Sequence, residues 1–391
     1  MNARKITDKI SLLGYVDWDA RLFDSLIPLP DGTSYNAYLI KGSKKNVLID
    51  TVEAEFASEL FSQLGDIKID YIISLHAEQD HSGAIPALLE KYPLAKVITN
   101  PKGKEMLIDL LHISDEKFIT VKDGETISLG DKTLEFIYTP WVHWPETMSL
   151  YLQEDKILFS CDFFGSHIAT TDVYVTDECR VYEAAKRYYS EIMMPFKPII
   201  VKDIDKLLTR DIAMIAPSHG PVYPNPSFII EAYQDWLSSA PHNKVVIPFI
   251  SMHGSTKMMV DYLVKSLVDK GVETVQYNLS VTDIGKLAID LVDAGTIVIG
   301  APTVLTGPHP VVAYATFLAN ALKPKAKFAS IIGSYSWGGK TVEVLASMIP
   351  NLKVEVLTPV IAKGLPKEDD FQALEKLATD IAKKHKELGF K

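Results

Sequence analysis

Cysteine is scarce in this sequence, and its scarcity limits the modules that the chain can carry. Only Cys161 and Cys179 occur among 391 residues. Two cysteines cannot build a disulfide framework, and such low usage is typical of proteins from a reducing compartment, so we expect a cytoplasmic protein. A small iron or iron–sulfur module held by four cysteines of its own is excluded.

Long apolar runs are also missing from the chain. No segment approaches the ~20 consecutive apolar residues that a membrane-spanning helix needs. The first eight residues carry charges but no apolar stretch after them. We therefore expect neither a signal peptide nor a membrane partner.

The charge is acidic overall and unevenly distributed. The formal net charge is −10, yet residues 244–391 hold 17 lysines against 14 acidic residues. An acidic first part and a mildly basic second part argue against nucleic acid as a partner. The asymmetry is compatible with head-to-tail self-association, although its more common meaning is solubility.

The length and the hydrophobic patterns indicate two domains, which we place at residues 1–243 and 244–391. In the first, short strands, turns and interspersed helices suit an αββα sandwich. The polar, proline-containing stretch Ser238–Asn243 is the predicted linker. In the second, five strands alternate with five helices, which predicts a doubly wound parallel sheet that binds ligands beyond the carboxyl ends of its strands. The predicted strands are Val245–Ile250, Thr274–Leu279, Thr296–Gly300, Phe328–Gly333 and Val354–Leu357.

A run of metal-binding side chains follows the apolar, strand-like segment Tyr71–Leu75. Within six residues the sequence places His76, Glu78, Asp80 and His81. Two imidazoles and two carboxylates exceed what one ion usually takes from one short loop, so the run predicts a two-metal site. The alternative is a solvated polar loop after a strand.

Three more candidate ligands, His143, Asp162 and His219, each follow a short apolar strand. Taken singly, each fits an ordinary loop histidine or a capping aspartate. Because each of these strands ends at a potential ligand, the pattern favours one shared metal centre. The shorter pattern H-x-H-x-D-H marks zinc hydrolases of the metallo-β-lactamase superfamily, but Glu78 stands at its second histidine, and an anionic oxygen favours iron or manganese over zinc.

A hydroxyl-rich loop, Ser251–Thr256, ends the first strand of the second predicted domain and precedes the predicted helix Lys257–Lys270. Backbone N–H groups and the helix dipole at such a position favour a phosphate. No Walker A lysine follows, which argues against a nucleoside triphosphate and leaves a monophosphate. The alternative is an ordinary helix N-cap.

These segments together resemble the flavodiiron proteins. The similar motifs are the H-x-E-x-D-H run, T-P-x-x-H-W-P around His143, S-C-D-F-F-G-S-H around Asp162, A-P-S-H-G around His219, and Ser34–Leu39 near the N-terminus. The resemblance covers nearly the whole chain. It implies a metallo-β-lactamase-like αββα sandwich with a non-haem diiron site, followed by a flavodoxin-like domain with FMN. The implied activity is reduction of dioxygen to water, of nitric oxide to nitrous oxide, or of both.

The resemblance also implies a role for individual residues. One iron is expected at His76, Glu78 and His143, the other at Asp80, His81 and His219, with Asp162 bridging them. Candidate catalytic residues that donate a proton or hydrogen bond to the bound gas are His167, Tyr188 and Tyr189, for which structural packing is the alternative; the two tyrosines fall in a predicted helix, Tyr182–Met193. FMN is expected at Ser251, Met252, His253, Gly254, Ser255, Thr256, Pro302, Thr303, Val304, Leu305, Ser334, Tyr335, Ser336, Trp337, Gly338 and Gly339.

The partners implied by the resemblance are an external electron donor and a second copy of the chain. The donor is either rubredoxin or a reduced deazaflavin coenzyme, because the chain has no electron-transfer module of its own. A head-to-tail homodimer, or a dimer of such dimers, would place the FMN of one subunit beside the diiron centre of the other. Two alternatives remain open: a dizinc hydrolase fused to a flavodoxin-like module, and a flavin electron carrier without gas chemistry.

Overall fold

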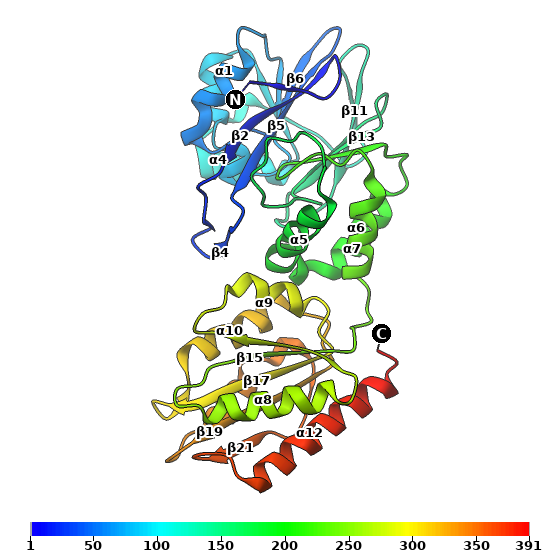
Figure 1. Cartoon of the computed structure of the whole chain (residues 1–391). Coiled ribbons are helices and arrows are strands. Elements are labelled where there is room, and N and C mark those ends of the chain that lie inside the picture. Colours follow the sequence, from blue (N-terminus) through cyan, green and yellow to red (C-terminus); the bar gives the residue numbers. More distant parts are fainter. Residues whose placement is uncertain (1, 391) are drawn as a thin grey trace. The chain divides into compact units, whose positions relative to one another are not determined.

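The structure is a computed structural model that describes residues 2–390, and it divides into two compact units (Figure 1). The first unit runs up to Tyr189 and includes Phe196–Asp235. The second unit comprises Ser190–Pro195 and the chain from Trp236 onward. The domain boundary between residues 243 and 244 stays a prediction.

The first unit contains two sheets. The first sheet has the strand order β1-β2-β5-β6-β7-β8-β9, and the second has the order β10-β11-β12-β13-β14. A small hairpin pairs β3 (Leu22–Phe23) with β4 (Ile27–Pro28). The strands of the first sheet are Arg4–Lys5, Ile10–Asp17, Thr33–Lys41, Asn46–Ile49, Tyr71–Ile73, Lys96–Thr99 and Phe118–Thr120, and those of the second are Thr126–Ser128, Thr133–Tyr138, Met148–Leu152, Ile157–Cys161 and Met214–Pro217.

Alternation along the strands builds two separate cores from the first sheet. On β5, Tyr38 and Ile40 belong to a core that also contains Phe136 and Phe159 of the second sheet, so this core lies between the two sheets. Successive side chains of a strand point to opposite faces, and Ala37 and Leu39 accordingly belong to a core shared with α1 (Ala57–Leu64), α3 (Ile85–Lys91) and α4 (Pro101–Leu111).

Helix α6 (Lys197–Leu207) lies on the second sheet, where Lys206 Nζ donates to the backbone oxygen of Tyr138 at 2.8 Å. Helices on both outer faces of two stacked sheets make the αββα sandwich that the sequence predicted.

The second unit is a parallel sheet of order β16-β15-β17-β19-β20 with apolar cores on both faces. Helices α8 (Ser255–Val268) and α12 (Glu368–Glu387) cover one face, and α9 (Ile284–Leu291), α10 (Pro310–Leu322) and α11 (Thr341–Ser347) cover the other. This is the predicted doubly wound, flavodoxin-like arrangement. The strands are β15 (Lys244–Phe249), β16 (Glu273–Asn278), β17 (Thr296–Val304), β18 (Gly307–Pro308), β19 (Phe328–Tyr335), β20 (Glu355–Val356) and β21 (Val360–Lys363).

Three local predictions were wrong in extent. The fifth strand is only Glu355–Val356, and the chain pairs with β19 again at Val360–Lys363. The helix predicted at Tyr182–Met193 is α5 (Glu178–Tyr188), capped by Asp177, followed by a π-helical turn at Tyr189–Met193. The ligand run was expected as a loop, but α2 (Gln79–Ser82) makes its second half helical. The remaining helix, α7, spans Pro226–Trp236.

Candidate functional site

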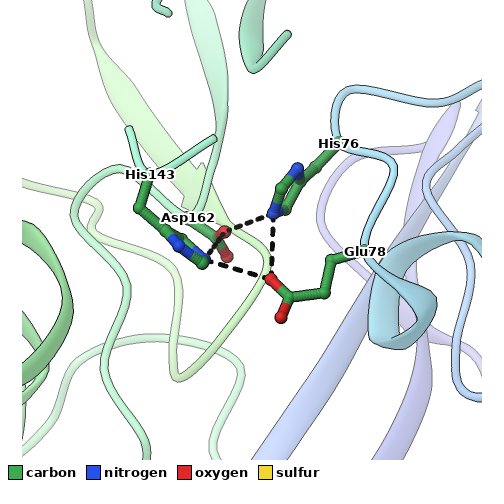
Figure 2. A group of neighbouring side chains, drawn as sticks. All are labelled: His76, Glu78, His143 and Asp162. Atoms are coloured by element: carbon green, nitrogen blue, oxygen red, sulfur yellow. Dashed lines mark hydrogen bonds and ion pairs between the residues drawn. The ribbon is translucent and has the colours of Figure 1, made fainter. Parts of the chain in front are cut away.

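The seven predicted metal ligands come together at the ends of strands from both sheets of the first unit. His76 and Glu78 follow β7, whereas His143, Asp162 and His219 follow β11, β13 and β14. In Figure 2 the side chains of His76 and Glu78, from one segment, point toward those of His143 and Asp162, from two others. Ligand atoms form one group from His76, Glu78, His143 and Asp162, and a second group from Asp80, His81 and His219.

The first group is arranged around Glu78. Its Oε2 lies 3.0 Å from Nε2 of His76 and 3.0 Å from Nε2 of His143. The same two nitrogens each lie 3.5 Å from Oδ2 of Asp162. Two histidines from different segments therefore face one oxygen of Asp162.

The second group is arranged around the other oxygen of that carboxylate. Oδ1 of Asp162 lies 3.0 Å from Nε2 of His81 and 3.2 Å from Nε2 of His219. The two oxygens of Asp80 lie 3.5 Å from His81 Nε2 and 3.2 Å from His219 Nε2. Asp162 thus faces both groups, one oxygen to each.

These spacings suit metal coordination better than hydrogen bonding. Two ligands bonded to one ion at about 2.1 Å lie roughly 3.0–3.4 Å apart at angles between square and tetrahedral. Both oxygens of Asp80 and of Asp162, and Nε2 of His81, are buried without a hydrogen-bond partner in residues 2–390. Buried carboxylates are normally paired or bound to a metal. The donor set therefore fits two cations.

The carboxylates raise the affinity of the neighbouring imidazoles for protons. Burial alone would lower the pKa of His76, but hydrogen bonds to Glu146 and Glu78 raise it to about 10. Burial would also lower the pKa of His219, but hydrogen bonds to Asp162 and Asp80 raise it to about 9. A pocket that attracts protons this strongly also attracts cations, so metal binding should release protons.

The sequence did not reveal the side chains that orient the ligands. Nδ1 of His76 donates to Oε1 of Glu146 at 2.7 Å, and the same oxygen accepts from Ala77 N at 2.9 Å. Nδ1 of His219 donates to the Ser34 backbone oxygen at 2.7 Å. Such partners fix the tautomer of a metal-binding histidine. Glu146 comes directly after the T-P-x-x-H-W-P segment, three residues after His143, but periodicity gives no signal for its contact with His76.

The three candidate catalytic residues differ in their relation to the ligands. The ring of His167 lies 4.9 Å from that of His219 and 4.8 Å from that of Tyr188, centroid to centroid. Nδ1 of His167 shares a hydrogen bond with Thr33 Oγ1 at 2.8 Å, and its Nε2 is buried without a partner in residues 2–390. The ring of Tyr189 packs on Tyr233, at 5.4 Å. Among the three, His167 and Tyr188 have ring contacts with a predicted ligand.

Burial sets the protonation of these two groups. Burial, and then the neighbouring His219, lowers the pKa of His167 well below its usual value, so its imidazole stays neutral. Burial, with the nearby Asp162, raises the pKa of Tyr188 well above its usual value, so its phenol keeps its proton. A neutral N–H or O–H group can donate a hydrogen bond without adding charge.

A pocket of about 430 Å³ opens at the carboxyl ends of the strands in the second unit. Thirteen of the sixteen predicted FMN residues line it, whereas Gly254, Gly338 and Gly339 are absent from its lining and Gly364 is added. Gly254, at φ 92°, is the N-cap of α8, and Ser251 Oγ accepts from its backbone N at 3.2 Å. Backbone N–H groups at a helix start can hold a phosphate, and the volume suits a cofactor.

Comparison with known sequences finds a matching family model and relatives that cover nearly the whole chain. A family model described as "ODP family beta lactamase" matches residues 33–220. The chain is 34% identical to the rubredoxin-oxygen oxidoreductase of Megalodesulfovibrio gigas, with 98% of each chain covered. It is 35% identical to the nitric oxide reductase of Moorella thermoacetica, covering 96% of this chain and 97% of the relative. It is 32% identical to the coenzyme F420H2 oxidase of Methanothermobacter marburgensis, covering 97% and 98%.

Solved structures are similar over the same length. The rubredoxin oxygen:oxidoreductase of Desulfovibrio gigas has a TM-score of 0.95 at 33% identity, with 99% of both chains covered. The flavodiiron protein of Giardia intestinalis has a TM-score of 0.93 at 28% identity, covering 99% of this chain and 98% of that one. Among the helices of residues 2–390, none combines the length and apolar character that crossing a bilayer requires.

Proposed function

The chain belongs to the flavodiiron protein family, and from this premise we propose how its residues carry the family's chemistry. The protein is an oxidoreductase that reduces dioxygen to water, nitric oxide to nitrous oxide, or both, with electrons that pass through FMN to a non-haem diiron site. The observation that carries the assignment of residues is Asp162, whose two oxygens face two separate groups of ligands.

We assign one iron to His76, Glu78 and His143 and the other to Asp80, His81 and His219, with Asp162 between them. Three carboxylates among seven ligands form a harder donor set than the histidine-rich sites of zinc hydrolases. This favours iron and argues against a dizinc hydrolase. When bound, two irons supply a Lewis-acid pair that also gives and takes electrons.

The protein's own side chains orient the metal ligands and offer hydrogen bonds to what binds between the metals. Glu146 holds the His76 ring through Nδ1, so that Nε2 points to the metal. The neutral His167 can donate from Nε2 when Thr33 Oγ1 donates to its Nδ1. The Tyr188 phenol, whose ring lies 5.9 Å from that of His219, is a second hydrogen-bond donor. Tyr189 fits a packing role better, because its ring contacts Tyr233.

We assign FMN to the pocket at the start of α8. Its phosphate would accept hydrogen bonds from the backbone at Ser255 and Thr256, and its ring would lie along the loops that contain Leu305 and Trp337. When bound, FMN supplies two electrons that can leave one at a time. The side chain of Trp337 is 68% exposed and that of Leu305 is 82% exposed, so an apolar rim is left for a partner to cover.

We infer that the partner is a second copy of the chain, in a head-to-tail dimer or a dimer of dimers. Exposed Trp18, Leu22 and Leu26 near the N-terminus offer an apolar surface on the first unit as well. The acidic first part and the basic second part complement each other in such an arrangement. An external donor, rubredoxin or a reduced deazaflavin coenzyme, then re-reduces FMN. The two cysteines, both free, support a reducing compartment such as the cytoplasm.

Steady-state consumption of each gas tests this function. Purified enzyme is mixed with dioxygen or nitric oxide and either reduced rubredoxin or the reduced deazaflavin coenzyme. We expect consumption of at least one gas with at least one donor. A flavin carrier without gas chemistry would oxidise the donor only when an artificial acceptor is added. Zinc-dependent hydrolysis without gas consumption would support the hydrolase instead.

A further inference from the structure

A continuous series of aromatic rings connects one predicted metal ligand to the protein surface. The ring of Tyr35 meets that of His219 edge to face, with centroids 6.0 Å apart. Phe56 stacks on Tyr35 at 5.6 Å and on Tyr15 at 3.8 Å. Tyr35 is buried, whereas Phe56 and Tyr15 are half-buried. The series therefore begins at the metal centre and ends where solvent has access.

The fold places the two tyrosines directly opposite each other. Tyr15 on β2 and Tyr35 on β5 are cross-strand partners in an antiparallel pair, and side chains in such pairs lie within about 5.5 Å at Cβ. Gly14, at φ 117°, keeps the strands close, because a Cβ there would lie 1.9 Å from the Tyr35 backbone oxygen. Gln63 of α1 makes two hydrogen bonds to the Gly14 backbone. Its Oε1 accepts from Gly14 N at 2.7 Å, and its Nε2 donates to Gly14 O at 2.8 Å. Figure 1 shows β2 and β5 as neighbouring strands.

The surroundings of Tyr15 provide acceptors for a phenolic proton. Burial, together with Asp17, Glu59, Asp19 and Glu55, raises the pKa of Tyr15 above its usual value. The phenol is therefore protonated at neutral pH. Once it loses an electron, a phenol becomes a strong acid, and these carboxylates and water take its proton.

Other aromatic rings at the metal centre do not offer the same route. The ring of Tyr188 also lies near His219, but this tyrosine is fully buried. Trp144 contacts His76 at 5.0 Å and His143 at 6.1 Å, so it serves the other group of ligands. Only the Tyr35 series, among these three, joins the His219 group to a half-buried tyrosine.

We propose that Tyr35 and Tyr15 are an auxiliary electron source, which completes dioxygen reduction when FMN has no electrons to give. This inference rests on the proposed function, because it takes the diiron centre as the place where dioxygen is reduced. The two extra electrons carry the reduction of dioxygen through to water, so that it does not end at a partly reduced, damaging oxygen species.

The proposed step balances in atoms and electrons. Reduction of one dioxygen to two waters consumes four electrons and four protons. Two electrons come from the diiron centre. Tyr35 and Tyr15 each lose one electron and one phenolic proton, which breaks the O–H bond and leaves a neutral phenoxyl radical. Two further protons come from water, and the oxidant is the dioxygen that the enzyme already consumes.

Freeze-quench electron paramagnetic resonance on the iron- and FMN-loaded enzyme tests the proposal. The enzyme is reduced with limiting dithionite and mixed with excess dioxygen. We expect the signal of a tyrosyl radical in wild type. This signal should become narrower when the protein contains ring-deuterated tyrosine. Tyr35→Phe should abolish most of the signal, because the link to His219 is lost. Tyr15→Phe should leave a radical on Tyr35 that decays faster and gives a different hyperfine pattern.

A matched control is Tyr92→Phe, which removes a phenol of the same unit whose ring lies against Lys91 Nζ, 5.5 Å from the ring centroid. This variant should keep the full signal. With ample donor, all three variants should consume gas at near wild-type rates, but with limiting donor Tyr35→Phe should inactivate after several-fold fewer turnovers. A signal unchanged in Tyr35→Phe, or a tryptophanyl radical in wild type, overturns the inference while gas consumption continues. Absence of dioxygen consumption by wild type overturns the dioxygen activity itself, and the inference with it.

Discussion

Glu146 accepts a hydrogen bond from Nδ1 of His76 at 2.7 Å, although seventy residues separate them in the sequence. The Glu146 side chain is buried, and the backbone oxygen of Glu146 accepts a hydrogen bond from Asn100 Nδ2. This contact fixes which nitrogen of His76 is free to face Glu78 and Asp162. A single buried carboxylate thereby connects the segment after β11 to the ligand run after β7.

Replacement of Glu146 should loosen the metal at His76. In Glu146→Gln the amide cannot stabilise the imidazole as a carboxylate does, so metal affinity should fall roughly 10- to 100-fold. Iron retention during dialysis against a graded chelator series measures the change. Exposed Glu90→Gln is the control and should match wild type. Equal iron retention in Glu146→Gln would contradict the role assigned to this contact.

Substitution of Asp162 should separate iron chemistry from flavin binding. In Asp162→Asn the amide cannot offer negative charge to two cations at once, so most gas-reductase activity should be lost while FMN stays bound. Flavin absorbance, iron content and gas consumption are measured on the same preparation. Near wild-type turnover with a full iron complement would show that Asp162 does not bridge.

The purified protein should contain about two irons and one FMN per chain, because seven ligands form two groups and one pocket lies at the start of α8. Elemental analysis and acid-released flavin give the ratios after expression in iron-replete medium. Stoichiometric zinc with little iron would favour the hydrolase alternative.

Two inactive chains should restore activity when they form a mixed dimer. His81→Ala disrupts the diiron site, and Thr256→Glu places a negative charge at the buried start of α8, where phosphate is expected. In a head-to-tail dimer, the FMN of the first chain would face the irons of the second. We expect substantial recovery in verified heterodimers. Inactive heterodimers of two folded variants would mean that electrons pass within one chain.

The second unit should lose stability as the pH falls. Burial lowers the pKa of His385 to about 4, below the ~6.5 of an unfolded chain. The neutral ring bonds to Thr296 Oγ1 at 2.7 Å and to Asn243 Oδ1 at 2.9 Å. Its contribution is fully present above pH ~6.5 and is lost as the pH falls toward the folded pKa, by about 2–3 kcal/mol in total.

Urea unfolding of wild type and His385→Gln at several pH values between neutral and acidic measures this effect. The variant should be less stable at neutral pH but should change less on acidification. If the free energy of unfolding falls equally with pH in the two proteins, the acid sensitivity comes from other groups.

The sequence by itself indicated the candidate ligand types and the two domain classes, and its motifs carry the resemblance that implied the cofactors. Each predicted ligand follows a short apolar strand, and regular alternation of strands and helices after Lys244 specifies a parallel sheet. These features are local, so neighbouring residues suffice to predict them. The π-turn after Tyr188 and the four-residue helix α2 escaped prediction because they are too short to show a period.

Only the tertiary structure showed how close the candidate ligands lie to one another and which side chains support them. Oδ2 of Asp162 lies 3.5 Å from His76 Nε2, whereas its Oδ1 lies 3.2 Å from His219 Nε2, so the two oxygens face different groups. Glu146, Gly364 and the Tyr35 series were likewise found only in space. Contacts between distant segments depend on how two sheets stack and how strands register, and the residues on either side carry no local signal of their partner.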